Sequence, residues 1–263
     1  VVPFRNRRPL LRELLDGLAA QTYADVEVVL VDDGSTDGAG DEAVDVHVGG
    51  RPVRVIRQPG LGAVAARQAG VAAVVGEVLA FTDSDCVPEP GWLAAGVAAI
   101  DAGADVVQGR TLPQRRPGLL ERTLTSEGDC LYQTCNVFYR RSAFDDAGGF
   151  DADGARRYGF LTGARSRGLG FGEDVAVGWR VRRNGRAVYE PSAVVRHHVF
   201  GVDLRDHVSR TMQVGGFPAL LREIPELRPI LLRYRVELGR GRGPLYGAAA
   251  AGAAGRPSLA AVL

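Results

Sequence analysis

Two short apolar segments early in the chain each stop at a cluster of aspartates. Residues 26–31 are almost continuously apolar and β-branched, and Asp32-Asp33 follows them directly. Residues 78–81 have the same character and lead into Thr82-Asp83-Ser84-Asp85. Apolar runs of this length are typical of strands in a parallel sheet that is covered on both faces. The pattern predicts a buried parallel sheet with acidic side chains at the carboxyl ends of two strands.

Helical and strand patterns alternate around these segments. A strand stub at residues 1–2 precedes a helix that opens at Pro9, a favoured residue for the first helical position, and continues with leucines at helical spacing. A third strand, at residues 53–56, leads through a glycine turn into an Ala-rich helix over residues 63–75. Strands and helices that alternate with short connections indicate an α/β fold with a mostly parallel central sheet flanked by helices.

The acidic strand ends are candidates for a ligand site. A single aspartate after a strand commonly caps the next turn or helix. Four acids on two strands of one sheet converge on one edge, which is where open α/β sheets bind their ligands. Carboxylates two residues apart, as in Asp83-Ser84-Asp85, suit a divalent cation because such ions prefer hard oxygen ligands. We therefore interpret these acids as a ligand site rather than as caps.

The second half of the chain has fewer regular patterns. Residues 108–172 are rich in arginine and glycine with little periodicity, apart from a strand-like piece at 135–139, and segments of this kind are usually functional loops. A helix is predicted over 173–184, because the apolar periodicity ends at Asn184-Gly185. A last strand over 187–195 leads into His197-His198.

Composition excludes several classes of chemistry. All 32 basic residues are arginine, so a P-loop lysine, a Schiff-base lysine and a lysine general base are impossible. The net charge of +1 gives no reason to expect a nucleic-acid partner. The three cysteines, Cys86, Cys130 and Cys135, match the spacing of neither a zinc site nor a disulfide framework. With no apolar run of membrane-spanning length and no leader at Val1, we expect a cytoplasmic protein.

Five motifs follow one another in the order and at the distances typical of one family: Val-Pro-x-x-Asn at 2–6, Val-Asp-Asp-Gly-Ser-Thr at 31–36, Thr-Asp-Ser-Asp at 82–85, Gly-Gly-Phe at 148–150 and Gly-Glu-Asp at 172–174. In these motifs the chain resembles the family-two glycosyltransferases with the GT-A fold. The resemblance covers roughly residues 1 to 200 and implies metal-dependent sugar transfer from a nucleotide-diphosphate-sugar to a hydroxyl, with inversion.

The resemblance also implies a division of the chain. Residues 1–203 would form the GT-A catalytic domain, with a nucleotide-binding half at 1–107 and an acceptor and catalytic half at 108–203. Residues 204–263 would add a helical segment that is first Arg-rich and then Ala/Gly-rich.

Four residues are expected to contact the nucleotide-sugar donor. Pro3 would lie where the first strand ends against the base, and Asp33 would hydrogen-bond the base. Arg67 would reach the nucleotide or its phosphates, and Asp83 would contact the ribose. Asn136 stands where the family often has glycine, which leaves the shape of the donor-sugar pocket open.

The remaining implied roles concern the metal and the base. Asp83, Asp85 and His197 would hold Mn²⁺ or Mg²⁺, and which of His197 and His198 faces the site stays open. Asp174 would be the general base that deprotonates the acceptor hydroxyl, and Glu173 would support it.

Other interpretations remain at this stage. A retaining transferase of the same fold and a non-catalytic nucleotide-sugar-binding relative share the motifs. A sugar-1-phosphate nucleotidyltransferase would need a Gly-rich first loop and commonly a lysine, neither of which the chain has. Residues 60–65 fit a dinucleotide fingerprint but follow the third strand rather than the first. The acceptor could be a glycan, a lipid-linked sugar or a small molecule.

The segment over 204–242 carries eight arginines against four acids, together with apolar residues at helical spacing. Such a helix could make peripheral contact with the cytoplasmic face of an anionic membrane. Because Pro225 and Pro229 interrupt it, packing against the catalytic domain is the favoured alternative.

Overall fold

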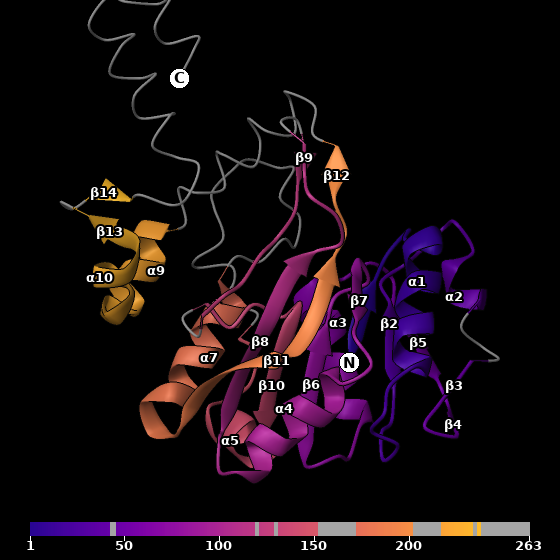
Figure 1. Ribbon diagram of the computed structural model, residues 1–263, viewed down its shortest axis with the longest axis horizontal. Coiled ribbons are helices and arrows are strands. Elements are labelled where there is room, and N and C mark those ends of the chain that lie inside the picture. Colours follow the sequence, from indigo (N-terminus) through magenta and orange to yellow (C-terminus); the bar gives the residue numbers. More distant parts are fainter. Residues whose placement is uncertain are drawn as a thin grey trace, which may run out of the picture. The chain divides into compact units, whose positions relative to one another are not determined.

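The computed structural model describes residues 1–42, 46–118, 121–128, 131–151, 172–201, 217–233 and 236–237 (Figure 1). The chain divides into two compact units, Val1–Ala219 and Leu220–Leu263.

The first unit begins with a parallel three-stranded sheet. Strands β1 (Val2–Phe4), β2 (Val29–Asp32) and β5 (Arg54–Arg57) lie in the order β1-β2-β5, with Pro3 opposite Val31. Every residue of β1 and β2 is buried, as expected for strands covered on both faces. The predicted parallel arrangement is confirmed for these strands.

Two long helices accompany this sheet. Helix α1 (Arg8–Ala19) buries an apolar stripe made by Leu11, Leu14, Leu15 and Leu18. Helix α3 (Ala63–Ala73) packs on β1 and β2. Between β2 and β5 in the sequence lie the short helix α2 (Ala39–Glu42) and the hairpin of β3 (His47–Val48) with β4 (Arg51–Pro52).

A five-stranded sheet continues the fold in the order β6-β10-β8-β11-β7 (Figure 1). Its strands are β6 (Val78–Thr82), β7 (Cys86–Pro88), β8 (Val106–Pro113), β10 (Asn136–Arg140) and β11 (Ala187–His197). Strands β8 and β11 are parallel, whereas β10 runs antiparallel to both β6 and β8 and β11 runs antiparallel to β7. Hydrogen bonds from Val1 to Ala80 and from Thr82 to Val1 place β1 next to β6.

The expected α/β class is confirmed, but the expected mostly parallel sheet needs correction in this second half. Residues 78–81 form the predicted strand, yet its neighbour β10 approaches in the opposite direction. The apolar pattern of a strand reports burial on its faces and does not specify the direction of its partner.

The expectation of irregular loops over 108–172 also needs correction. The predicted strand piece at 135–139 is present as β10, but the region also contains most of β8 and helix α5 (Arg141–Asp146). The short strand β9 (Glu121–Arg122) pairs with β12 (Phe200–Gly201). Strand β8 reads Val-Val-Gln-Gly-Arg-Thr-Leu-Pro and is buried over its first four residues, so no polar alternation marks it in the sequence. Residues 152–171 of the expected loop lie outside the described residues.

Helices α4 (Trp92–Asp101) and α7 (Glu173–Asn184) complete the first unit. Helix α4 packs on β6, β8, β10 and β11, and α7 packs on α5 and β8. Helix α7 begins and ends at the predicted residues.

Asn136 is a packing residue of the sheet interior. Its Nδ2 donates to the carbonyl oxygens of Arg110 and Ala193, both at 2.9 Å, and its Oδ1 accepts from Trp92 Nε1 at 2.8 Å. The register of β11 against β8 shifts at this point, between residues 190 and 194, which frees the Ala193 carbonyl. A Cβ at Gly109 would lie 2.3 Å from Asn136 Oδ1, so this asparagine requires glycine as its neighbour. The residue expected to shape the sugar pocket therefore satisfies buried backbone groups.

The C-terminal unit contains short elements: most of α9 (Phe217–Glu223), the 3-10 helix η3 (Pro225–Leu227), α10 (Arg228–Leu231), β13 (Leu232–Arg233) and β14 (Val236–Glu237). The predicted long amphipathic helix is divided where Pro225 and Pro229 enter. Leu220, Leu221, Ile224 and Leu227 are buried. None of the helices described is long and apolar enough to cross a membrane. Residues 202–216 and 238–263 of the predicted Arg-rich and Ala/Gly-rich segment lie outside the described residues.

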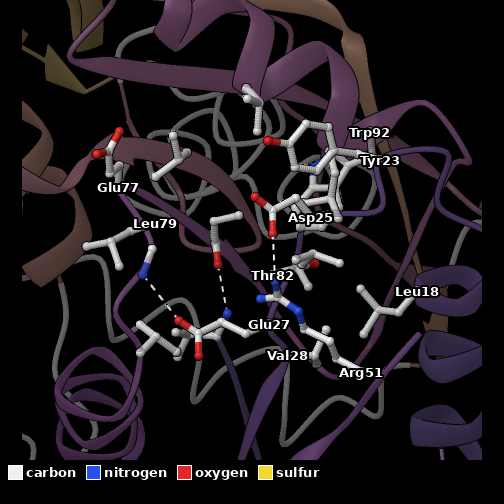
Figure 2. A pocket seen from close by; sticks show the side chains of 18 of the residues that line it. Leu18, Tyr23, Asp25, Glu27, Val28, Arg51, Glu77, Leu79, Thr82 and Trp92 are labelled. Atoms are coloured by element: carbon white, nitrogen blue, oxygen red, sulfur yellow. Dashed lines mark hydrogen bonds and ion pairs between the residues drawn. The ribbon is translucent and has the colours of Figure 1, made fainter. Parts of the chain in front are cut away.

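A cavity of about 430 Å³ lies near the amino ends of β1, β2 and β6, where Val1, Val28 and Val78 line it (Figure 2). Its wall includes the Asp25–Arg51 ion pair, with the two charged groups 2.9 Å apart. None of the predicted site residues, all of which are described, lines this cavity.

The Asn136 bonds predict a stability effect. Asn136→Ala leaves one indole N–H and two carbonyl oxygens buried without their partner. We expect the free energy of unfolding, measured by urea denaturation, to fall by about 3 kcal/mol or more, because three groups lose their partner and each unsatisfied buried group costs about 1–3 kcal/mol. The control Asn184→Ala, at the exposed end of α7, should change it by less than about 0.5 kcal/mol. Equal effects in the two variants would contradict the assignment.

Candidate active site

A buried arginine connects the end of β6 to the start of α7. Arg67, on α3, donates from Nη2 to Asp83 Oδ1 at 3.0 Å and from Nη1 to Glu173 Oε1 at 3.1 Å. Its side chain is 8% exposed, against 31% for Asp83 and 9% for Glu173. Burial lowers the pKa of Arg67, but the two carboxylates outweigh burial and raise it above its ordinary value. Arg67 is therefore a fixed cation that brings two distant acids together.

Asp174 follows Glu173 in the first turn of α7. Gly172 allows the chain to enter this helix in the left-handed region, with φ at +80°. Burial, reinforced by the Glu173 carboxylate, raises the pKa of Asp174 from 3.8 to about 7, although Arg67 and the Val175 amide act in the opposite direction. The Val175 N–H donates to Asp174 Oδ1 at 2.8 Å. A carboxyl group with this pKa can both accept and release a proton near neutral pH.

Asp85, Cys86 and His197 form a cluster at the ends of β6 and β11. One ligand atom from each lies within 4.8 Å of the others, and His197 Nε2 is 3.7 Å from Asp85 Oδ1. His197 Nδ1 lies 2.7 Å from the His198 carbonyl oxygen and faces away from Asp85. Nε2 is the ring nitrogen that faces Asp85, so it is the atom of His197 that could bind a metal.

Of the two adjacent histidines, His197 is the one that faces Asp85. His197 is buried, whereas His198 is turned so that its Nδ1 lies 3.0 Å from Gln114 Oε1 on the exposed side. Thr123 Oγ1, 3.1 Å from His197 Nδ1, holds the ring further.

The chemistry of this cluster fits a divalent cation. Burial and the nearby Asp83 carboxylate raise the pKa of Asp85, which shows that the negative charge here is only partly compensated. A carboxylate and a neutral imidazole are ligands that Mn²⁺ accepts. The Cys86 thiol is hydrogen-bonded to Cys135, and its pKa is raised well above the ordinary value, so it stays protonated. Asp85 and His197 are therefore the groups that could hold the ion.

Asp83 and Cys86 add to what the sequence predicted. Asp83 pairs with Arg67 through Oδ1 and lies outside the three-residue cluster of the described residues, and its share in the metal stays a prediction. Cys86 was not expected near the site, although its position directly after Asp85 was a usable signal. Cys130, the third cysteine, lies outside the described residues.

Asp33 holds the loop between β5 and α3. Its Oδ1 accepts from Gln58 Nε2 at 2.6 Å and from the Leu61 amide at 2.7 Å, and its Oδ2 accepts from the Gly62 amide at 3.0 Å. Pro3 lies buried in β1, one strand away. The structure thus places both residues predicted to contact the base at the edge where β6 and β11 end, while the carboxylate of Asp33 already fixes a neighbouring loop.

Trp179, on α7, is a packing residue. It is 5% exposed, and its ring packs edge-on against Tyr132 with the centroids 6.4 Å apart. The Arg182 guanidinium lies over the indole at 4.9 Å.

The fold and the acidic strand ends define the class as a GT-A-type glycosyltransferase. The chain belongs to glycosyl transferase family 2, whose family model matches residues 1–152.

Curated relatives carry related names. The pre-mycofactocin glycosyltransferase of Mycobacterium tuberculosis (strain ATCC 25618 / H37Rv) is 29% identical over 259 residues, which cover 88% of this chain and 49% of the relative. Glycosyltransferase AglE of Haloferax volcanii is 28% identical over 172 residues, covering 57% of this chain and 54% of the relative. The chain thus spans about half the length of these relatives.

Solved structures share the fold. The mannosyltransferase PcManGT from Pyrobaculum calidifontis, in complex with GDP-Man and Mn²⁺, superposes with a TM-score of 0.66 at 22% identity and covers 99% of this chain and 76% of its own. S. aureus TarS in complex with UDP-GlcNAc has a TM-score of 0.53 at 22% identity, covering 75% and 57%.

The Arg67 pairs predict a second stability effect. Arg67→Met leaves Asp83 and Glu173 without the cation between them, and breaking a buried pair on one side costs about 3–5 kcal/mol. We expect the free energy of unfolding at neutral pH to fall by about 3 kcal/mol in urea titrations, the lower end because Asp83 is partly exposed. The control Arg51→Met breaks the exposed pair with Asp25 and should cost less than about 1 kcal/mol. Similar losses for the two variants would refute a special role for the buried guanidinium.

Proposed function

We propose that this chain is an inverting, metal-dependent glycosyltransferase that moves a sugar from a nucleoside diphosphate-sugar onto an acceptor hydroxyl. The observation that carries the proposal is the ion-pair network through Arg67. It connects Asp83, at the strand end where the donor would bind, to Glu173, whose neighbour Asp174 has a raised pKa. A donor-side acid and a candidate base thereby belong to one rigid unit.

Asp85 and His197 would hold Mn²⁺ or Mg²⁺. The bound ion would supply positive charge to the diphosphate that leaves. The protein's part is to keep Nε2 of His197 turned toward Asp85, which the His198 carbonyl and Thr123 do by holding Nδ1. That PcManGT binds Mn²⁺ together with GDP-Man supports this part of the proposal.

Asp174 would accept the proton of the acceptor hydroxyl as the oxygen attacks the anomeric carbon. A single displacement of this kind, with the base and the leaving group on opposite sides, inverts the configuration at that carbon. Glu173, held by Arg67, would make the Asp174 carboxylate a stronger base, because its own negative charge raises the pKa of Asp174.

The nucleoside would bind along the ends of β1, β2 and β6. Asp33 and Pro3 would contact the base, Asp83 the ribose, and Arg67 would orient Asp83. The relatives named above include proteins solved with UDP-GlcNAc and with GDP-Man, so the same fold accepts different bases and sugars. The acceptor is a glycan, a lipid-linked sugar or a small molecule, and we place the reaction in the cytoplasm, with peripheral membrane contact through the C-terminal segment as a further proposal.

The metal role predicts dependence on a divalent ion. With a panel of UDP-, GDP-, ADP- and CDP-sugars and water as acceptor, release of nucleoside diphosphate should require Mn²⁺ or Mg²⁺ and stop in excess chelator. Asp85→Asn should weaken Mn²⁺ binding, measured by calorimetry, by at least roughly 10–100-fold, the loss typical even of residues that only support a metal ligand. Asp25→Asn, on the far edge of the sheet, is the control. Full turnover in chelator would disprove the metal role.

The base role predicts a pH signature. Asp174 must be ionised to accept a proton, so the wild-type rate should rise with pH through about 7 and level off above it. Asp174→Asn should lower the rate of diphosphate release by about 10²–10⁴-fold, remove this rise, and leave nucleoside diphosphate affinity nearly unchanged. The exposed Asp16→Asn serves as the matched control. Loss of nucleotide affinity together with rate would show that Asp174 binds the donor instead.

A further inference from the structure

The turn between β1 and α1 is fixed on both sides of Arg7. Asn6 adopts a left-handed conformation with φ at +50° and accepts a hydrogen bond from the Thr36 amide at 2.8 Å. The Arg8 amide donates to Asp37 Oδ2 at 3.1 Å. Because the residues before and after it are tied to the loop that follows β2, Arg7 has a defined backbone position.

The Arg7 guanidinium lies beside the candidate metal ligands. Its Nη2 is 4.0 Å from Asp85 Oδ2, while His197 Nε2 approaches the other oxygen of Asp85. Its Cζ lies over the ring of Phe200, 5.3 Å from the centroid. A separation of 4.0 Å is longer than a hydrogen bond. Within the described part of the chain, the Arg7 side chain thus has a loose ion pair and a ring contact but no closer polar contact.

Phe200 reaches this place through the pairing of β12 with β9. Strand β9 also supplies Arg122, whose guanidinium lies over the same ring at 4.9 Å, and His198 contacts the ring at 4.9 Å between centroids. The ring therefore offers an aromatic face that supports a guanidinium group without using its N–H donors. The Arg7 side chain is 39% exposed, so its N–H donors are open to a ligand.

The charges at this edge of the sheet would favour a further cation beside a bound diphosphate. A nucleoside diphosphate-sugar is anionic, and its diphosphate gains a further negative charge when the bond from the anomeric carbon to the phosphate oxygen breaks and the electron pair stays on the oxygen. Asp83 and Asp85 add negative charge nearby. Arg67 is buried and has both terminal nitrogens committed to carboxylates.

We propose that Arg7 binds the diphosphate of the donor and of the departing nucleoside diphosphate. This inference rests on the function proposed above. The planar guanidinium presents paired N–H donors that match two phosphate oxygens, which a lysine ammonium does not. Asp85 keeps the group near the site, and Phe200 supports its face.

The test compares nucleotides that differ by one phosphate. Wild type, Arg7→Gln, Arg7→Lys and the control Arg51→Gln are titrated by calorimetry with UDP, GDP, ADP and CDP and with the corresponding monophosphates, in the presence of Mn²⁺. The comparison uses the nucleobase whose diphosphate binds wild type most tightly. For it, Arg7→Gln should lose about 10–100-fold in nucleoside diphosphate affinity, the range for a charge-assisted hydrogen bond, and less than about 3-fold in nucleoside monophosphate affinity. Arg7→Lys should recover only part of the loss, and Arg51→Gln should bind like wild type.

A second measurement separates binding from a structural role. Mn²⁺ alone, without nucleotide, should bind Arg7→Gln at least as tightly as wild type, because the substitution removes a cation near Asp85 and no metal ligand. Weaker Mn²⁺ binding, or equal losses for mono- and diphosphates, would overturn the proposal. Unchanged diphosphate affinity in Arg7→Gln would overturn it while leaving the proposed function standing. If wild type itself bound no nucleoside diphosphate, both would fall.

Discussion

The buried guanidinium of Arg67 is the interaction on which the arrangement of this site depends. A cation that is 8% exposed is stable only with carboxylates in contact, and its two partners come from segments about 90 residues apart in the sequence. The end of β6 and the start of α7 must therefore meet at α3. This contact positions Asp83 and Glu173, and with them Asp174. The raised pKa of Asp174 follows from the burial of the same region.

The fold could be predicted from sequence where local patterns suffice. Helix α7 lies at the predicted residues because apolar periodicity, first-turn acids and a terminal Asn-Gly all agree. The parallel strands β1, β2 and β5 follow from apolar runs joined by short helical connections. Strand β8 and the reversed direction of β10 were missed, because both depend on which distant segment fills the neighbouring place in the sheet.

Prediction from sequence is limited in the same way for the side-chain contacts of the candidate site. The motifs identified Asp33, Asp83, Asp85, Glu173 and Asp174 as a set and placed them on strand or helix ends. They could not show that Asp33 holds the loop at residues 58–62, or that Asp83 pairs with Arg67. Those contacts join residues that sequence spacing does not relate, and only the packed sheet brings them together.

The pairing of Asn136 with Gly109 has a consequence for how this sheet can evolve. The asparagine fills the space that a side chain at residue 109 would need, and it caps the carbonyl freed by the register shift in β11. A Cβ at residue 109 would also lie 2.5 Å from the Ala193 carbonyl oxygen, so a smaller residue at 136 does not by itself make room there, and it leaves the Trp92 indole without its acceptor. The backbone at the register shift of β11 therefore requires both glycine at 109 and asparagine at 136, and an evolutionary change at either position alone is expected to lower the stability of the sheet.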